Sequence, residues 1–337
     1  MNLGSEIIQM NLIIEKFNMK DEEKWDSFIE KNSVNGTFLH SRKFLNYHKD
    51  RFKDHSLLIK KGESIVAVIP ACEIVENNTK IFYSHKGSTF GGIIVSKDFN
   101  NISHVENIFN ILEEHLRYNK YDKLILKNTS EIFSNGNINL LDYFYFKNDY
   151  KNYNELSLYI DLKNCSPIIE NNFSTSKRRD LKYSLRHNLQ FRRLETDDEV
   201  NDFYNLLTTS LKKHNVKPVH SLQELLDFKN SRLKGIVKFY GVYYKDILIA
   251  GSMAFDFNSV VFHTQYLASD PVYSNYYPMN FLNYSLIKEA YVNKFSFFSF
   301  GISTEENGKF LNTSLAQFKE GFGAVGSNNR TYYKELK

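Results

Sequence analysis

The stretch GIVKFYGVYYKDILIAGSMAFDFNSVVFHTQYLAS, residues 235–269, decides the fold class. It consists of three runs rich in apolar, aromatic and β-branched residues, which are separated by Asp246 and by the turn residues around Asn258. Runs of this length that are punctuated by turn residues predict three consecutive antiparallel strands. The three predicted strands are 235–245, 247–257 and 259–269.

The elements predicted around this meander occur in the same order in both halves of the chain. Each half has helices before its strands, and a further helix and a final strand after them. The second half has helices at 197–215, 221–232 and 278–294 and its last strand at 295–303; the first half has helices at 21–32, 37–52 and 104–121, strands within 55–95 and its last strand at 122–128. The order predicts an α+β fold of two tandem units, each a mostly antiparallel sheet flanked by helices. We place the domains at 1–160 and 161–337.

Length and composition set the outer bounds. The 337 residues fit two domains of ordinary size. A net charge of +4 is too small and too dispersed to indicate a DNA-binding protein. Cys72 and Cys165 show no C-x-x-C spacing, which favours a reduced chain. We find no signal-peptide pattern at the start and no apolar run of about 18 residues, so we expect a cytoplasmic protein without a membrane span.

The element order and four sequence stretches resemble the Fem-like branch of the GNAT acyltransferase superfamily. More narrowly, they resemble the Fem-related enzymes that are found with bacterial surface-polysaccharide genes. The stretches are RRDLKYSLRHNLQFR (178–192), KHNVKPVHS (213–221), HTQYLAS (263–269) and FGISTEENGKFLNTSLAQFKEGFGA (300–324), and SHKGSTFGGIIV (84–95) fits the pattern in the first half.

This resemblance implies transfer of an acyl or aminoacyl group to an amine, with acyl-CoA or aminoacyl-tRNA as donor and no metal. Two departures stand out. CoA-binding GNAT proteins hold the pyrophosphate with a glycine-rich loop at a helix N-terminus, whereas the corresponding segment DPVYSNYYPMNFL (270–282) has no glycine. Relatives often have Asp where this chain has Ser299.

A basic segment precedes the second unit. Arg178, Lys182 and Arg186 recur at intervals of four residues and share one face of a predicted helix, with Arg179 beside them. Such a stripe could hold the phosphates of CoA, a nucleotide sugar or tRNA, or it could be a solvated helix face.

Two histidines of the second half are candidates for acid–base chemistry. His220 lies in a predicted loop after Pro218, where an imidazole of near-neutral pKa could act as general base, while Ser221 is the better N-cap. His263 and Gln265 lie on a central strand, where polar side chains either line a wet site or pair with one another. Strict alternation predicts these two on one face, and Tyr266, a candidate substrate contact, on the other. In GNAT units this strand also polarises the acyl carbonyl.

The segment after the last strand contains many small and polar residues. We predict a turn at Gly301 and a substrate loop containing Ser303, Thr304, Glu305 and Asn307. A carboxylate such as Glu305 could accept the proton of the attacking ammonium, and Lys319 could bind phosphate or carboxylate. The alternative is an ordinary capping loop before a helix at 311–321.

The residues and the resemblance together predict an N-acyltransferase. The acceptor would be the amine of an amino sugar, nucleotide- or lipid-linked, in surface-polysaccharide biosynthesis, and His220 or Glu305 would take its proton. One alternative is a Fem-type ligase that uses aminoacyl-tRNA to extend a peptidoglycan stem peptide, and the other is a non-catalytic GNAT-like binding module. The sequence does not indicate the oligomeric state.

Overall fold

The structure, a computed structural model, describes residues 12–212 and 215–337. Residues 1–11, on which the absence of a signal peptide was predicted, and Lys213 and His214 of the KHNVKPVHS stretch lie outside the described residues. The chain divides into two compact units, one comprising residues up to Asn154 together with Asn329–Lys337, and the other Glu155–Asn328. The predicted boundary at 160/161 therefore lies six residues late, and the last nine residues belong with the first unit.

The first unit contains ten helical segments and eight strands of its own among the described residues. The helical segments are η1 Met19–Asp21, α1 Glu22–Ser27, η2 Phe28–Asn32, η3 Phe38–His40, α2 Arg42–Leu45, η4 Asn46–Arg51, η5 Lys97–Phe99, α3 Ile102–Tyr118, η6 Glu131–Phe133 and α4 Asn139–Lys147. The strands are β1 Leu12–Lys16, β2 Lys53–Asp54, β3 Leu57–Lys61, β4 Ser64–Ile69, β5 Cys72–Glu76, β6 Thr79–Ser84, β7 Ile94–Val95 and β8 Lys123–Lys127.

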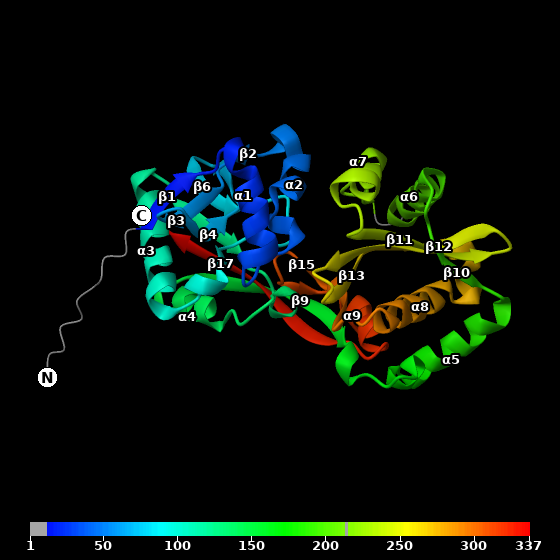
Figure 1. Ribbon diagram of the computed structural model, residues 1–337. Coiled ribbons are helices and arrows are strands. Elements are labelled where there is room, and N and C mark those ends of the chain that lie inside the picture. Colours follow the sequence, from blue (N-terminus) through cyan, green and yellow to red (C-terminus); the bar gives the residue numbers. More distant parts are fainter. Residues whose placement is uncertain (1–11, 213–214) are drawn as a thin grey trace, which may run out of the picture. The chain divides into compact units, whose positions relative to one another are not determined.

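Alternation along β3 and β4 explains how helices cover both faces of the sheet β1-β3-β4-β7 (Figure 1). Leu58 and Val68 point to the cluster formed by Trp25 on α1 and by η2. Their neighbours Leu57 and Ile69 belong to the larger core that contains α3 and α4. Because successive strand residues face opposite sides of the sheet, both faces of these apolar strands are buried.

Two long strands join the units along the chain. The chain leaves the first unit within β9 (Lys151–Asp161) and returns to it within β17 (Val325–Glu335). In the first unit the end of β17 pairs antiparallel with β8, from Thr331 with Lys127 to Glu335 with Lys123. A single boundary between two consecutive domains, as predicted from the sequence, does not describe this return of the chain to the first unit.

The second unit contains the meander. Its remaining elements are η7 Leu162–Asn164, η8 Ile169–Asn172, α5 Thr175–Ser184, η9 Leu185–His187, β10 Gln190–Arg193, α6 Asp197–Lys212, α7 Leu222–Asp227, η10 Phe228–Arg232, β11 Val237–Tyr244, β12 Ile247–Phe257, β13 Val261–Ser269, η11 Pro271–Tyr276, α8 Pro278–Val292, β14 Phe297–Ile302, β15 Thr304–Glu305, β16 Phe310–Leu311 and α9 Thr313–Glu320. The predicted strands 235–245, 247–257 and 259–269 correspond to β11, β12 and β13.

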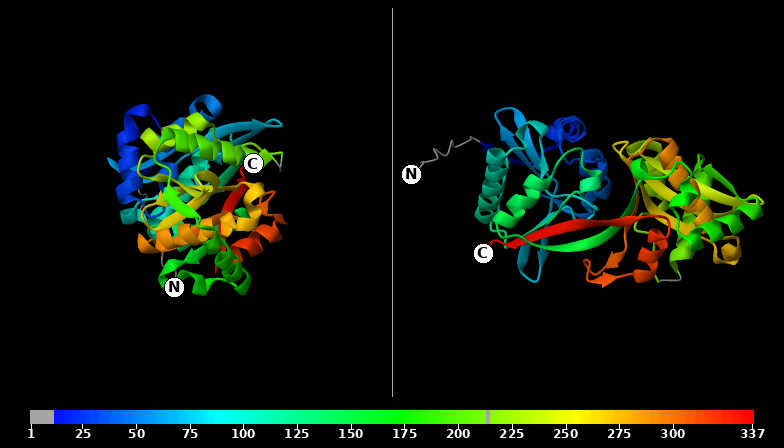
Figure 2. Two further views of the ribbon diagram at one scale, coloured as in Figure 1. Left: turned by 90° about the vertical axis from the view of Figure 1, so that its right-hand side faces the viewer. Right: turned by 90° about the horizontal axis from the view of Figure 1, so that it is seen from below.

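The sheet of this unit has the order β10-β11-β12-β13-β14-β9. Its neighbouring strands are antiparallel except for β13 and β14, which are parallel and connected by α8. Helices α6 and α7 cover one face, and α8 with α5 covers the other, in both Figure 1 and the turned view on the left of Figure 2. The predicted α+β class is confirmed.

Candidate active site

The central feature of the site is the point at which β13 and β14 part. Their parallel pairing covers three residue pairs and ends with His263 opposite Ser299. Beyond this pair β13 continues along β12 to Ser269, whereas the register of β14 shifts before Gly301. A substrate carbonyl placed where the strands part would meet strand backbone, whose N–H groups can hold a developing oxyanion.

A β-bulge in β13 changes which side chains share a face. The register between β12 and β13 shifts by one residue, so that Gln265 is extra in β13. On either side of this bulge, His263 pairs with Phe255 and Tyr266 pairs with Met253. Because Phe255 and Met253 are two residues apart on one strand, they share a face, and so do His263 and Tyr266. The prediction that Tyr266 faces away from His263 is therefore wrong.

The shared face is the one that α6 and the segment before α7 cover. Gly251, two residues before Met253, lies against the Phe203 ring of α6. Nδ1 of His220 lies 2.7 Å from the Tyr266 hydroxyl, and the His220 side chain is buried. Burial raises the pKa of Tyr266 to about 12, so the phenol keeps its proton at neutral pH. His220 therefore faces the strand that bears His263 rather than solvent.

Ser221, not His220, caps the following helix. The Ser221 hydroxyl accepts a hydrogen bond from the Glu224 amide, and the Glu224 carboxylate accepts one from the Ser221 amide. This capping box begins α7 as the sequence predicts. The His220 ring therefore takes no part in capping α7. It contacts Tyr266 and meets Phe228 edge-on, with 5.3 Å between ring centroids.

His263 is held by the neighbouring strand. Its Nδ1 lies 3.1 Å from the Ser299 hydroxyl, which also accepts a hydrogen bond from the Gly301 amide. Burial lowers the pKa of His263 to about 4, and the positive charge of Lys319 acts in the same direction. The ring is therefore neutral at pH 7 and can both donate and accept a proton. Ser299 was noted in the sequence only as a departure from relatives.

Lys319 does not project into solvent. Its side chain is buried on α9, and its ammonium donates to the carbonyls of Gly301 at 3.0 Å and Ile302 at 2.6 Å. Burial lowers the pKa of Lys319 to about 8. The ammonium therefore fixes the end of β14 beside His263, which differs from the predicted contact with a substrate phosphate or carboxylate.

The predicted substrate loop is mainly a small hairpin. Ser303 and Thr304 are buried, and the Thr304 hydroxyl accepts a hydrogen bond from the Leu156 amide. Glu305, the last residue of β15, is exposed, and so is Asn307, which lies on the turn between β15 and β16 with a positive φ of 56°. The Glu305 carboxylate accepts a hydrogen bond from the Asn312 side chain at 3.4 Å. Turn and capping geometry thus account for most of the polar residues in this stretch.

The basic stripe lies on the other side of the sheet from His263. Leu181 of α5 packs in the core that contains α8 and Phe262, next to His263 on β13. The four candidate cations of this helix region are exposed: Arg178, Arg179, Lys182 and Arg186. Two contacts place α5 beside the beginning of α8: Lys177 Nζ donates to the Asn280 side chain at 3.4 Å, and the Tyr183 ring stacks on Tyr277.

The glycine-free segment before α8 is filled by tyrosines. Tyr276 of η11 stacks on Tyr244 with 4.8 Å between ring centroids, and the His187 ring contacts it edge-on at 4.5 Å. Tyr277 takes a left-handed conformation with φ 53°, and Pro278 begins α8. The geometry here is unlike a glycine-rich loop that offers successive backbone amides to a pyrophosphate.

Within the described ranges, no cluster of three or more His, Cys, Asp or Glu side chains is arranged to hold a metal ion. Among the same residues, no helix has both the length and the hydropathy needed to cross a membrane.

Comparisons with known proteins agree with the observed geometry. Residues 172–319 match the family described as acetyltransferase (GNAT) domain. No curated protein sequence matches the chain. Among solved structures, that of FemX is 11% identical with a TM-score of 0.69, covering 94% of this chain and 96% of FemX. L-PGS from Bacillus licheniformis is 14% identical with a TM-score of 0.57, covering 94% and 93%.

A tandem GNAT protein from the clavulanic acid biosynthesis pathway has a TM-score of 0.56 at 8% identity, with coverage of 97% of this chain and 99% of that one. At such identities the structures share a fold, and the matched family covers the unit that bears His220, His263 and Lys319.

Proposed function

We propose that the chain is an acyltransferase of the Fem-like branch of the GNAT superfamily and that it transfers an acyl or aminoacyl group to the amine of an amino sugar; the GNAT domain match and the fold shared with FemX and the tandem GNAT protein support this. The observation that carries this proposal is the parting of β13 and β14 immediately after His263 and Ser299. The donor carbonyl would lie there against the backbone of β13, and an amine would attack it.

We assign proton removal to His220. A general base must reach the attacking amine on the face from which it approaches, and the bulge at Gln265 directs Tyr266, the hydrogen-bond partner of His220, to the His263 face. Glu305 is the alternative base, on an exposed hairpin. His220→Gln and Glu305→Gln variants separate the two assignments, since the true base loses about 100-fold or more in kcat.

Lys319, Ser299 and Gln265 would position the reacting groups. Lys319 holds the carbonyls of Gly301 and Ile302, and Ser299 and Gln265 orient the His263 ring. Ser303, Thr304 and Asn307 stay candidates for acceptor contacts at the hairpin that begins next to these residues.

The phosphate-bearing part of the donor molecule would lie beside the beginning of α8. Arg178, Arg179, Lys182 and Arg186 could then neutralise its phosphates, since α5 contacts α8 near Asn280 and Tyr277. The tyrosines that replace a glycine-rich loop favour an aminoacyl ester of RNA over CoA, because aromatic rings can stack on bases. A Fem-type ligase acting on a stem peptide would use the same donor, and only the acceptor distinguishes it.

The deciding experiment is mass spectrometry of the products formed from defined pairs of substrates. Acetyl-CoA and a mixture of aminoacyl-tRNAs serve as donors, and nucleotide-linked amino sugars and a stem pentapeptide serve as acceptors. We expect an N-acylated amino sugar that is absent when Lys319→Met replaces the wild type. Product on the peptide alone would favour the ligase. If the protein is folded and no pair of substrates gives a product, the non-catalytic binding module is the alternative that remains.

A further inference from the structure

The first unit contains a pocket of its own. It has a volume of about 580 Å³, which falls within the roughly 300–1,000 Å³ typical of small-molecule sites. Its walls come from the end of β1, from α2 and η4, from β2 and from the residue that follows β6.

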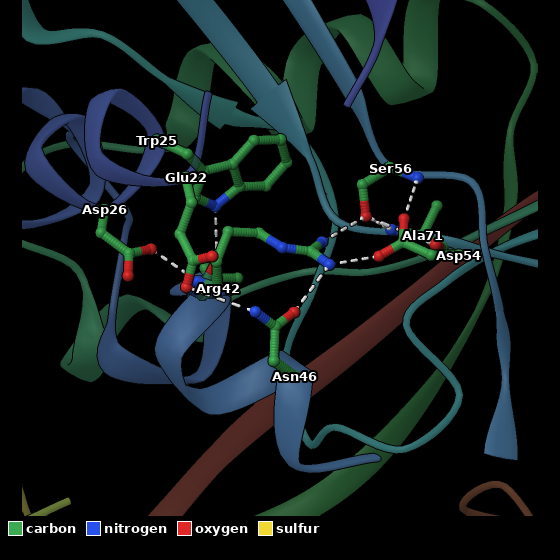
Figure 3. Close-up of polar contacts among 9 residues, drawn as sticks. Glu22, Trp25, Asp26, Arg42, Asn46, Asp54, Ser56 and Ala71 are labelled. Carbon is green, nitrogen blue, oxygen red and sulfur yellow. Dashed lines mark hydrogen bonds and ion pairs between the residues drawn. The ribbon is translucent and has the colours of Figure 1, made fainter. Parts of the chain in front are cut away.

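One wall is a rigid polar network around Arg42 (Figure 3). The buried guanidinium donates to the Ser56 hydroxyl and to the Asn46 side-chain oxygen, each at 3.0 Å, and forms an ion pair with Asp54. Asp54 in turn accepts a hydrogen bond from the Ser56 amide at 2.8 Å. The guanidinium carbon lies 4.0 Å from the centroid of the Phe17 ring. Contacts on several sides hold these planar groups in fixed orientations.

Another part of the lining is built from two histidines and a phenylalanine. The rings of His48 and His85 are stacked with 5.1 Å between centroids, and Phe52 meets each of them edge-on at 5.0 and 5.3 Å. Gly87 allows this packing, because a Cβ there would lie 2.3 Å from His48 and 2.6 Å from Phe52. This part of the lining is therefore aromatic and partly apolar.

Two buried polar atoms of these walls have no hydrogen-bond partner among the described residues. They are Nδ1 of His85, whose side chain is 3% exposed, and Nε of Arg42, which is 4% exposed. Buried polar atoms in native proteins are paired in the large majority of cases, so each of these two atoms calls for an explanation. Both residues line the pocket.

The charges of the pocket do not favour a strongly anionic ligand. Its lining contains three cations, Lys16, Arg42 and Lys49, against two carboxylates, Asp50 and Asp54, and Arg42 is already paired with Asp54. Burial, together with the neighbouring His48, lowers the pKa of His85 to about 3, so this ring is uncharged at pH 7. A neutral imidazole has one N–H donor and one acceptor, which suits a hydroxyl group better than a phosphate.

We propose that this pocket binds a neutral hexose unit. Asp54, Asn46 and His85 present planar polar groups that can bind neighbouring hydroxyls, while Phe52 presents an apolar ring to the C–H surface of a sugar. Lys49, at the same pocket, has the strained backbone angles φ 50° and ψ −126°. Such strain costs roughly 1–3 kcal/mol and clusters at ligand sites. This inference does not depend on the acyl transfer proposed for the second unit.

Calorimetric titration of the full chain with methyl glucoside, methyl galactoside and methyl N-acetylglucosaminide tests the proposal. We expect one-to-one binding of at least one glycoside without any donor. His85→Phe, which keeps a ring but removes both nitrogens, should weaken binding about tenfold, the loss of one or two hydrogen bonds. His115→Phe on α3 is the matched control and should bind like the wild type.

A second variant keeps the test decisive if His85→Phe fails to fold in a thermal melt. Phe52→Leu removes the aromatic ring and no polar group, and should weaken binding about threefold or more, whereas Phe146→Leu on the exposed side of α4 should not. The proposal is wrong if the folded wild type binds none of the glycosides. It is also wrong if both pocket variants bind as the wild type does, or if inorganic phosphate displaces the glycoside.

Discussion

Lys319 is a buried cation whose partners are backbone carbonyls rather than carboxylates. A lone buried ammonium is costly, and here the cost is offset by two hydrogen bonds to the end of β14. Those carbonyls belong to Gly301 and Ile302, and the Gly301 amide shares the Ser299 hydroxyl with His263. One side chain thus links α9 to the strand end and to the histidine at which β13 and β14 part.

Replacing Lys319 by Met should remove activity and change the pH dependence of stability. A lysine with a pKa of about 8 when folded and 10.5 when unfolded binds fewer protons in the folded state between these values. The wild type should therefore gain stability relative to Lys319→Met as the pH rises from about 8 to 10.5. Urea unfolding at several pH values measures this difference. Lys309→Met, on the exposed hairpin, should show no such dependence, and equal curves for both variants would contradict the prediction.

Gly301→Ala should reduce turnover more than its cost in stability explains. Gly301 has a φ of 73°, where an L-residue costs roughly 1–2 kcal/mol, and its Cβ would lie 3.2 Å from Cε1 of His263. Gly235→Ala is the matched control, since Gly235 has a φ of 86° and no neighbour within 4 Å. We expect similar losses in melting temperature and, for Gly301→Ala alone, about a tenfold or greater loss in kcat. Full activity in that variant would show that the His263 ring need not be fixed.

At the scale of elements, one extra residue in β13 decides the composition of the site. The two-residue repeat of a strand predicts correctly which face of the sheet each side chain occupies up to His263. After the bulge, each side chain lies on the face opposite to the one that this repeat predicts. Gln265 is polar and unremarkable in sequence, and no glycine marks the bulge. The one signal in the sequence that the regular alternation could fail in β13 is the presence of several polar residues at the centre of this strand.

Deleting Gln265 should separate Tyr266 from His220, because regular pairing would turn Tyr266 to the α8 face. We expect loss of activity and at least about 3 kcal/mol of lost stability, as apolar and polar side chains would exchange faces. Gln265→Ala keeps the extra residue and should fold with a nearly unchanged melting temperature. Two-dimensional NMR of the histidine rings reports the His220 environment in both variants. An intact His220 signal after the deletion would contradict this account.

At the scale of the whole molecule, the end of the chain returns to the first unit and stabilises it. The Tyr332 ring stacks on Tyr145 with 4.0 Å between centroids, its hydroxyl donates to Asp142, and the Lys334 ammonium contacts Glu113 at 2.8 Å. These contacts lie more than 180 residues apart in sequence. They belong to the unit that the sequence alone assigned to residues 1–160.

Removing residues 329–337 should destabilise the first unit although they follow the second. Hydrogen exchange should accelerate in β8, which loses its partner β17, and stay slow in β12 and β13. Deleting Lys337 alone is the control and should change neither. Equal acceleration in β8 and β13 would show that the two units do not unfold separately.

The protein should lose stability in mild acid. Burial, as the largest cause, lowers the pKa of His40 to about 4, of His85 to about 3 and of His263 to about 4, all below the ordinary value of 6.5. Between these values the unfolded chain binds more protons, so the free energy of unfolding falls as the pH decreases from 6.5, by up to about 2 kcal/mol per histidine at pH 5. Denaturant unfolding at several pH values measures this loss. Between pH 6.5 and pH 5 the free energy of unfolding should fall less steeply with pH in His40→Gln than in the wild type, while His187→Gln should show the wild-type pH dependence.

The sequence by itself determined the two α+β units, the meander of β11 to β13 and the resemblance to acyltransferases, because periodicity, turn residues and helix caps act within a few neighbouring residues. It also located His263 on a strand and His220 in a loop, whereas the turn predicted at Gly301 is wrong, because Gly301 lies within β14 just after a register shift and pairs with Leu158. Only the tertiary structure decided that Tyr266 faces His220, that the Lys319 ammonium binds backbone carbonyls, that the chain end completes the first unit and that His48 and His85 stack in the wall of a pocket. Those features depend on register and on contacts between residues far apart in the chain, whose energies no local pattern contains.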